Sequence, residues 1–219
     1  MIVISGAQIA DTPLAWPVQD SRTLVKGQIG AFVEDDIRTP DGQLITREYL
    51  EHPGAVGIIA LDDHDRVALV RQYRHPVRQR LVEPPAGLMD VDGESGVASA
   101  RRELAEEVGL AAATWHVLID PYSSPGIIGE ALRIFLARDL SPVDAPDGFE
   151  REGEEAHMDI VWATLDDLVE AILDGRLHNP SMVSGVLAAW TARARDGFAS
   201  LRPADAPWEA RDGIIASQG

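Results

Sequence analysis

The chain has 219 residues and no cysteine, and its 36 acidic and 19 basic residues give a formal net charge of −17. This negative charge weighs against nucleic acid as a partner, because phosphate backbones are bound through clustered Lys and Arg. A chain without cysteine forms no disulfides, which fits a cytoplasmic protein. With 45% hydrophobic residues it can bury a core, and no apolar run reaches the roughly 18 residues of a membrane helix.

Residues 1–50 are predicted to form an N-terminal antiparallel β unit. The first residues lack the basic region that precedes the apolar run of a signal peptide. The pattern predicts one short strand within 23–36, a turn at 40–42 and an extended run over 44–52. A unit of this size is too small to bury a core alone.

Strands and helices alternate through the rest of the chain. Apolar runs predict strands from Ala55 and over 66–74, 115–124 and 131–140. Residues 159–175 begin as a strand and turn helical near Asp166, and Gly175 is a natural helix stop. The order predicts an α/β protein with a mixed sheet between helices.

The last predicted helix begins near Pro180 or Ser181. Its apolar spacing assigns four side chains to the core: Met182, Val186, Leu187 and Trp190. From Gly197 onward, prolines and scattered polar residues predict a tail that lies loosely on the surface. We therefore divide the chain into an N-terminal unit (1–50), a main domain (51–196) and a tail (197–219).

The most informative stretch is GLMDVDGESGVASARRELAEEVGL, residues 87–110. Its second half places Glu103, Glu106 and Glu107 on one face of a helix, because residues three and four apart are helix neighbours. Like charges at that spacing repel one another, so we expect a positive group there, and hard divalent cations take oxygen ligands. The plainer interpretation is a solvated acidic helix face.

This stretch resembles the Nudix box, which reads Gly, five residues, Glu, seven residues, Arg-Glu, an aliphatic, any residue, Glu-Glu, any residue, Gly and an aliphatic. The matching residues are Gly87, Glu94, Arg102, Glu103, Leu104, Glu106, Glu107, Gly109 and Leu110. In one departure, six residues rather than five separate Gly87 from Glu94, which lengthens the loop before the helix. The resemblance implies a Nudix-type α/β/α sandwich.

Segments around the box resemble those of ADP-ribose pyrophosphatases: RQYR at 71–74, EPPAG at 83–87, and an SPG loop with Pro125 sixteen residues after Gly109. That resemblance implies Mg²⁺-dependent hydrolysis of ADP-ribose to AMP and ribose 5-phosphate, with Mn²⁺ as an alternative cation. Two other functions remain open. One is hydrolysis of another nucleoside diphosphate sugar, and the other is a non-catalytic ADP-ribose sensor, which has no need of the full carboxylate set.

The same resemblance implies roles for individual residues. The Ala86 carbonyl, Glu103 and Glu107 correspond to metal ligands. Glu106 and a loop glutamate, Glu155, correspond to catalytic residues, with Glu154 and His157 as competing candidates for the base. Substrate contacts fall on five residues: Arg47, Arg74, Pro125, Gly126 and Glu130. For the arginines the alternative is a surface role that balances an acidic chain.

Two further expectations concern support and assembly. Glu94 and Arg102 should form an ion pair that fixes the geometry of the helix. Similar enzymes exchange an N-terminal β segment across a twofold axis, which implies a homodimer in which Phe32 or Trp16 stacks on adenine. The expected partner is a small ADP-sugar, with no nucleic acid and no membrane.

Overall fold

The computed structural model describes residues 3–144 and 157–217. Its larger sheet has eight strands in the order β11-β5-β4-β10-β8-β12, with β6 paired to β5 and β7 to β4. Strand β10 runs parallel to β4, and the other pairs in this sheet are antiparallel. The strands are β4 (Ala55–Leu61), β5 (Arg66–Arg74), β6 (Gln79–Glu83), β7 (Ala86–Leu88), β8 (Leu110–Ile119), β10 (Leu132–Pro142), β11 (Asp159–Thr164) and β12 (Arg202–Pro203).

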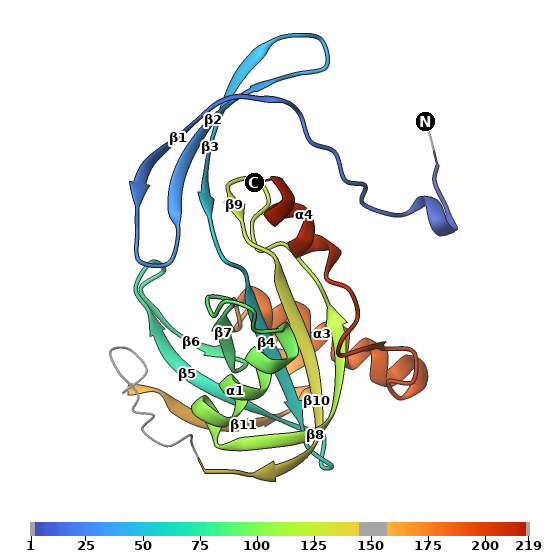
Figure 1. Ribbon diagram of the computed structural model, residues 1–219. Coiled ribbons are helices and arrows are strands. Elements are labelled where there is room, and N and C mark those ends of the chain that lie inside the picture. The colour runs from blue at the N-terminus through green and yellow to red at the C-terminus, as the bar shows by residue number, and fades with distance from the viewer. Residues whose placement is uncertain (1–2, 145–156, 218–219) are drawn as a thin grey trace.

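Helices cover both faces of this sheet (Figure 1). Helix α1 (Gly96–Val108) packs on one face, and α2 (Leu165–Leu173) and α3 (Pro180–Asp196) pack on the other. Successive side chains of a strand point to opposite faces, so in β4 Ile58 joins the core under α1 while Ile59 joins the core under α3. The predicted α/β/α sandwich with a mixed sheet is confirmed.

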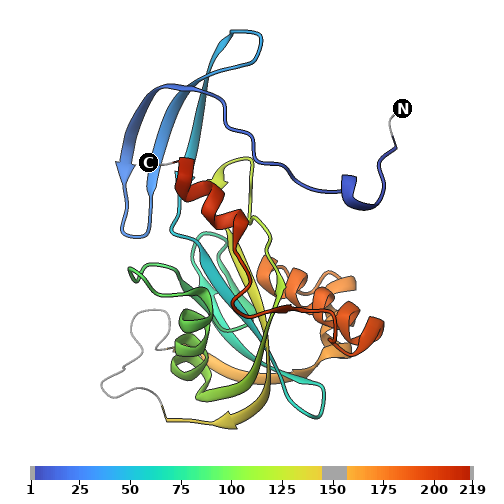
Figure 2. The same ribbon diagram turned by 45° about the vertical axis from the view of Figure 1, so that its right-hand side comes forward.

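A smaller sheet extends away from the sandwich, as the two views in Figures 1 and 2 show. It contains β1 (Val18–Lys26), β2 (Ala31–Arg38), β3 (Leu44–Glu51) and the short β9 (Ile128–Gly129), and β1, β2 and β3 are antiparallel. The single strand expected within 23–36 is wrong, because the chain reverses at 27–30. There the Gly27 N–H donates to the Gly30 carbonyl at 2.8 Å. A short 3-10 helix, η1 (Gly6–Gln8), precedes this sheet.

The C-terminal segment differs most from its expectation. It does not lie loosely on the surface: Trp208 is 8% exposed, and Ala206, Ala210 and Ile214 pack against the same core as α1. Strand β12 joins the edge of the large sheet, and α4 (Glu209–Ser217) follows it. In α3 the core assignment holds for Met182 and Val186 but is wrong for Trp190, which is 40% exposed.

Within the described residues, no helix combines the length and apolar character that a membrane crossing requires.

Candidate active site

Helix α1 carries the acidic cluster and has well-defined ends. The Ser95 hydroxyl accepts a hydrogen bond from the Ala98 N–H at 3.3 Å, which caps the first turn. Gly109 ends the helix in the left-handed conformation at φ 66° and donates to the Ala105 carbonyl. Ala100, Leu104 and Val108 face the core, so the helix is fixed in rotation and its glutamates are directed away from the buried stripe or along its edge.

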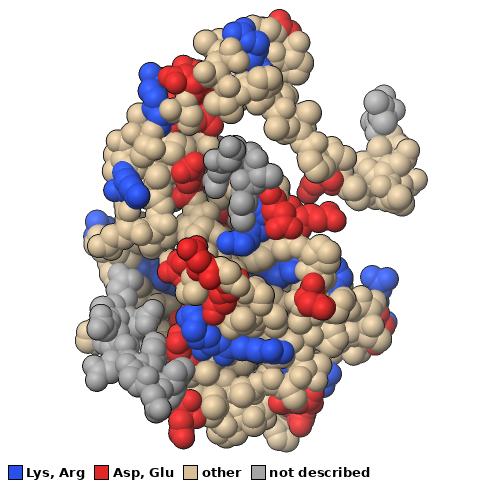
Figure 3. Space-filling model, in the orientation of Figure 1, with Lys and Arg blue, Asp and Glu red and all other residues tan. Residues whose placement is uncertain are grey.

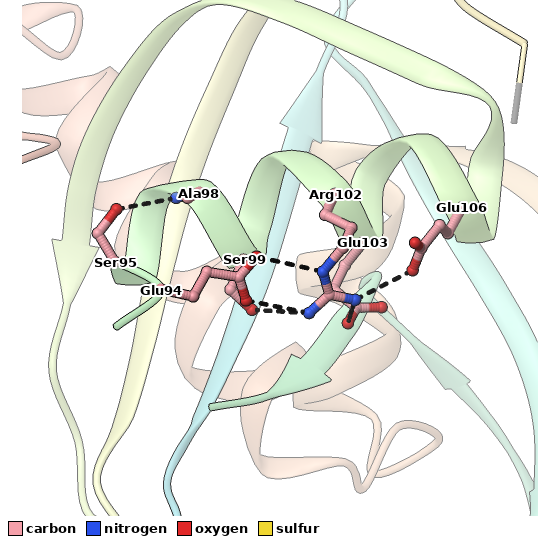
Figure 4. A network of polar contacts seen from close by, with 7 residues as sticks. All are labelled: Glu94, Ser95, Ala98, Ser99, Arg102, Glu103 and Glu106. Atoms are coloured by element: carbon pink, nitrogen blue, oxygen red, sulfur yellow. Dashed lines mark hydrogen bonds and ion pairs between the residues drawn. The ribbon is translucent and has the colours of Figure 1, made fainter. Parts of the chain in front are cut away.

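Arg102 supplies the positive charge that the glutamate cluster needs (Figure 4). Its guanidinium donates to both carboxylate oxygens of Glu94 at 3.2 Å, to Glu103 at 2.6 Å and to Glu106 at 3.1 Å. The predicted pairing of Glu94 with Arg102 is confirmed. Hydrogen bonding to Glu94 raises the pKa of Arg102 above its already high value, so the guanidinium stays charged.

Glu103 and Glu107 both reach the short segment Ala86–Gly87. The Glu107 carboxylate, in a side chain that is 5% exposed, accepts a hydrogen bond from the Ala86 N–H at 2.9 Å. A Cβ added to Gly87 would lie 2.1 Å from Glu103 Oε1. The Glu103 carboxylate therefore occupies the space that any other residue at position 87 would fill.

A cavity of about 500 Å³ opens beside this segment. It is lined by five of the predicted site residues: Arg74, Ala86, Glu103, Glu107 and Glu130. In the described part of the chain, no three Asp, Glu or His side chains already sit at metal-binding distances. The donor set still fits a hard divalent cation, because two carboxylates and the backbone segment Ala86–Gly87, which could supply a carbonyl oxygen, line the same cavity.

Replacing Gly87 with alanine tests this packing. The new methyl group would displace the Glu103 carboxylate, and we expect turnover to fall by about 10- to 100-fold, the range seen when support around a metal ligand is disturbed. Steady-state rates and thermal melting would be measured together. Gly213→Ala is the control, since a Cβ there meets nothing within 4 Å. Full activity of the Gly87 variant would contradict the assignment of Glu103.

Arg74 also lines the cavity and is held by a buried acid. Its Nε and Nη2 donate to Glu83, which is 1% exposed, at 3.1 and 2.7 Å. Gln72 donates to the same carboxylate at 3.1 Å. Glu83 thus orients the guanidinium at the cavity wall.

Four predicted site residues do not line this cavity in the described part of the chain. Arg47 lies on β3 in the smaller sheet and donates to the Thr46 carbonyl. Glu106 is turned toward Arg102. Pro125 and Gly126 are exposed in the loop after β8. Glu130, which does line the cavity, approaches His52 Nδ1 at 3.2 Å.

Two of the three candidates for the general base, Glu154 and Glu155, lie outside the described residues. His157 is exposed, directly before the buried Met158. The next residue, Asp159, begins β11 and accepts a hydrogen bond from Arg71 at 2.8 Å, which lowers the pKa of Asp159. Strand β11 is therefore anchored to β5.

Several cavity residues were not predicted, among them Gln72 and Ser123. Gln72 lies within the RQYR segment, and its side-chain amide donates a hydrogen bond to Glu83. Ser123 directly precedes the SPG loop, and its buried Oγ has no hydrogen-bond partner among the described residues. The sequence feature that could have identified Ser123 is its position directly before the SPG motif.

Charge is mixed rather than uniform over the face seen in Figure 3, where basic side chains lie among acidic ones despite the net charge of −17. The cavity lining contains Arg74 and Arg102 but five acidic residues. A bound divalent cation would therefore be needed beside the arginines to offset the negative field for an anionic ligand.

Comparison with known proteins gives consistent matches. Residues 51–184 match the family model described as NUDIX domain. An ADP-ribose pyrophosphatase from Mycobacterium tuberculosis is 42% identical over 198 residues, which cover 90% of this chain and 93% of that protein. A methanol dehydrogenase activator from Bacillus methanolicus is 32% identical, covering 74% and 86%. A crystal structure of an ADP compounds hydrolase superposes with a TM-score of 0.70 at 22% identity, covering 86% of this chain and all of that one.

Proposed function

This chain belongs to the NUDIX family, and on that premise we propose that it hydrolyses the pyrophosphate of ADP-ribose to AMP and ribose 5-phosphate. The observation that carries the proposal is the cavity that Glu103 and Glu107 of the box line together with Arg74. A pyrophosphate is an anion, and this lining offers both a candidate cation site and a guanidinium to bind it. The name of the M. tuberculosis relative supports ADP-ribose as the substrate.

Family membership implies a divalent cation as cofactor, and we propose Mg²⁺, with Mn²⁺ as the alternative. When bound by Glu103, Glu107 and the Ala86 carbonyl, such an ion would neutralise phosphate charge and acidify a water molecule. Arg74 presents a planar fork that suits phosphate oxygens, and Glu83 holds that fork in place.

The chemical step is hydrolysis of the pyrophosphate bond. Water adds its oxygen to one phosphorus, and the bond from that phosphorus to the bridging oxygen breaks. Glu155 takes the proton from the attacking water, and the bridging oxygen leaves on the other phosphate, where it is neutralised by a proton from solvent. We assign Glu106 to the catalytic carboxylates and Glu130 to the substrate side of the cavity. Pro125 and Gly126 do not line the cavity, and their contact with the substrate stays a prediction.

We also propose that the protein is a homodimer in which Arg47, with Phe32 or Trp16, reaches the partner's cavity. All nine residues of β1 are exposed in one chain, among them Val18, Leu24 and Val25. An exposed apolar edge strand is a surface that proteins normally cover. The division of the chain at residues 50 and 196 and a cytoplasmic location stay predictions, as does the absence of nucleic acid and membrane partners.

Sedimentation at micromolar concentration tests the dimer. We expect a species of twice the chain mass, and we expect Val25→Asp on β1 to shift it toward a monomer because burying an unpaired carboxylate costs several kcal/mol. Glu170→Gln on the exposed face of α2 is the matched surface control. A wild-type protein that is active as a monomer would overturn this proposal.

A substrate panel separates the candidate functions. With Mg²⁺, we expect ADP-ribose to be turned over faster than other nucleoside diphosphate sugars, with AMP and ribose 5-phosphate as the products. Faster turnover of a different nucleotide sugar would favour the first alternative. Tight ADP-ribose binding with no product in Mg²⁺ or Mn²⁺ would favour the sensor.

A further inference from the structure

The C-terminal segment, residues 202–214, returns to the main domain and is fixed there by a buried arginine. Arg133 on β10 is 4% exposed and donates to both carboxylate oxygens of Asp120, at 2.7 and 2.9 Å. It also donates to the Ala206 and Pro207 carbonyls, each at 2.7 Å, and its guanidinium lies 4.9 Å from the Trp208 ring centroid. A buried charge with this many partners holds the segment in one place.

From that anchor the segment touches three separate parts of the chain. A Cβ added to Gly96 would lie 3.3 Å from Trp208 Cζ3, so the indole packs on the first residue of α1. The Tyr122 hydroxyl donates to the Ala210 carbonyl at 3.2 Å. Arg211 Nε donates to the Pro53 carbonyl at 3.3 Å.

Each of these three parts leads directly into the cavity wall. Helix α1 carries Glu103 and Glu107, Tyr122 precedes Ser123, and Pro53 and Gly54 precede Ala55. Gly54 has φ +90°, and a Cβ on it would lie 3.4 Å from Arg211 Nε, so the connection between β3 and β4 passes closely under the arginine. Both ribbon views place α4 beside β9 (Figures 1 and 2).

We infer that the C-terminal segment is a clamp that sets the geometry of the active-site cavity, with Tyr122 and Arg211 as positioning residues. The inference rests on the proposed function for its kinetic consequence. Neither residue lines the cavity, so each acts through the segment that it holds. Walls that are ordered before the substrate arrives lower the ordering cost of binding.

The double variant Tyr122→Phe, Arg211→Met tests the clamp. It removes one hydroxyl and one guanidinium donor, and it keeps the tyrosine ring and an apolar stem against Trp208. We expect KM for ADP-ribose to rise about tenfold, the size expected when one or two further groups must be ordered on binding, while kcat stays within about twofold. Arg176→Met is the control, since Arg176 is exposed and forms its ion pair with the exposed Asp174.

A purely stabilising role gives a different result. A smaller folded fraction lowers the apparent kcat and leaves KM unchanged, and that outcome would overturn the inference. Hydrogen exchange on the substrate-free protein supplies a readout that does not depend on activity. We expect faster exchange at the amides of Gly54, Ala55 and 122–124 in the double variant, and at 122–124 in Tyr122→Phe alone. Unchanged exchange there would overturn the clamp even if ADP-ribose proves not to be the substrate.

Discussion

Replacing Glu107 with glutamine should remove most hydrolysis of ADP-ribose while leaving the fold intact. The amide oxygen of glutamine can still accept the Ala86 N–H, so the buried hydrogen bond at 2.9 Å is retained. What is lost is a negative charge at the proposed cation site. Changing groups that only support a metal ligand costs about 10- to 100-fold, so losing a direct ligand should cost more than about 100-fold.

The measurement is turnover at saturating Mg²⁺, together with a thermal melt. We expect the melting temperature to hold or rise, because relief of repulsion between Glu103 and Glu107 favours the helix. Glu170→Gln makes the same chemical change at an exposed position on α2 and should have normal activity. Near-normal turnover of the Glu107 variant would contradict the assignment of Glu107 as a metal ligand.

The second large effect is expected at the loop glutamate. If Glu155 accepts the proton of the attacking water, Glu155→Gln should lower kcat by about 10²- to 10⁴-fold, which is what general-base catalysis contributes. The affinity for ADP-ribose, measured by titration calorimetry, should change little, because the base acts after the substrate is bound.

Two neighbours serve as controls for this assignment. Glu154→Gln should have a much smaller effect on kcat, and His157→Ala should leave the pH profile of kcat nearly unshifted. Imidazole and carboxylate groups titrate in different pH ranges, so a pH profile distinguishes a histidine base from a carboxylate base. Loss of activity in the histidine variant, with activity kept in the Glu155 variant, would transfer the role of the base to His157.

The parts of the site that could be predicted from the sequence are those governed by local spacing. Helical periodicity places Glu103 and Glu107 on one face, and seven residues separate Glu94 from its partner Arg102. Apolar runs likewise identify β4, β5, β8, β10 and β11 of the large sheet, because a strand covered on both faces is apolar throughout. These features depend on residues close to one another in the chain. Apolar runs did not identify the short β6, β7 and β12, and β8 begins five residues before the predicted strand.

The parts that could not be predicted depend on contacts between distant residues. Arg133 meets the Ala206 and Pro207 carbonyls, more than seventy residues away, and backbone acceptors leave no mark in a sequence. A proline-containing tail therefore has the composition of a loose segment although it is docked. The reversal at Gly27–Gly30 was missed for a related reason: a Cβ on Gly30 would lie 2.0 Å from the Glu51 carbonyl oxygen, a contact with a different strand.

Arg102 lies between Glu94, Glu103 and Glu106, so the acidic face of α1 carries its own counter-charge. In small metal-dependent domains the ligands come together only when the ion binds, and removing the ion unfolds the chain. Here the cap, the apolar packing and the guanidinium all come from the chain itself. We therefore expect the chain to fold without a bound cation, and a cooperative thermal melt in the presence of a chelator would check this.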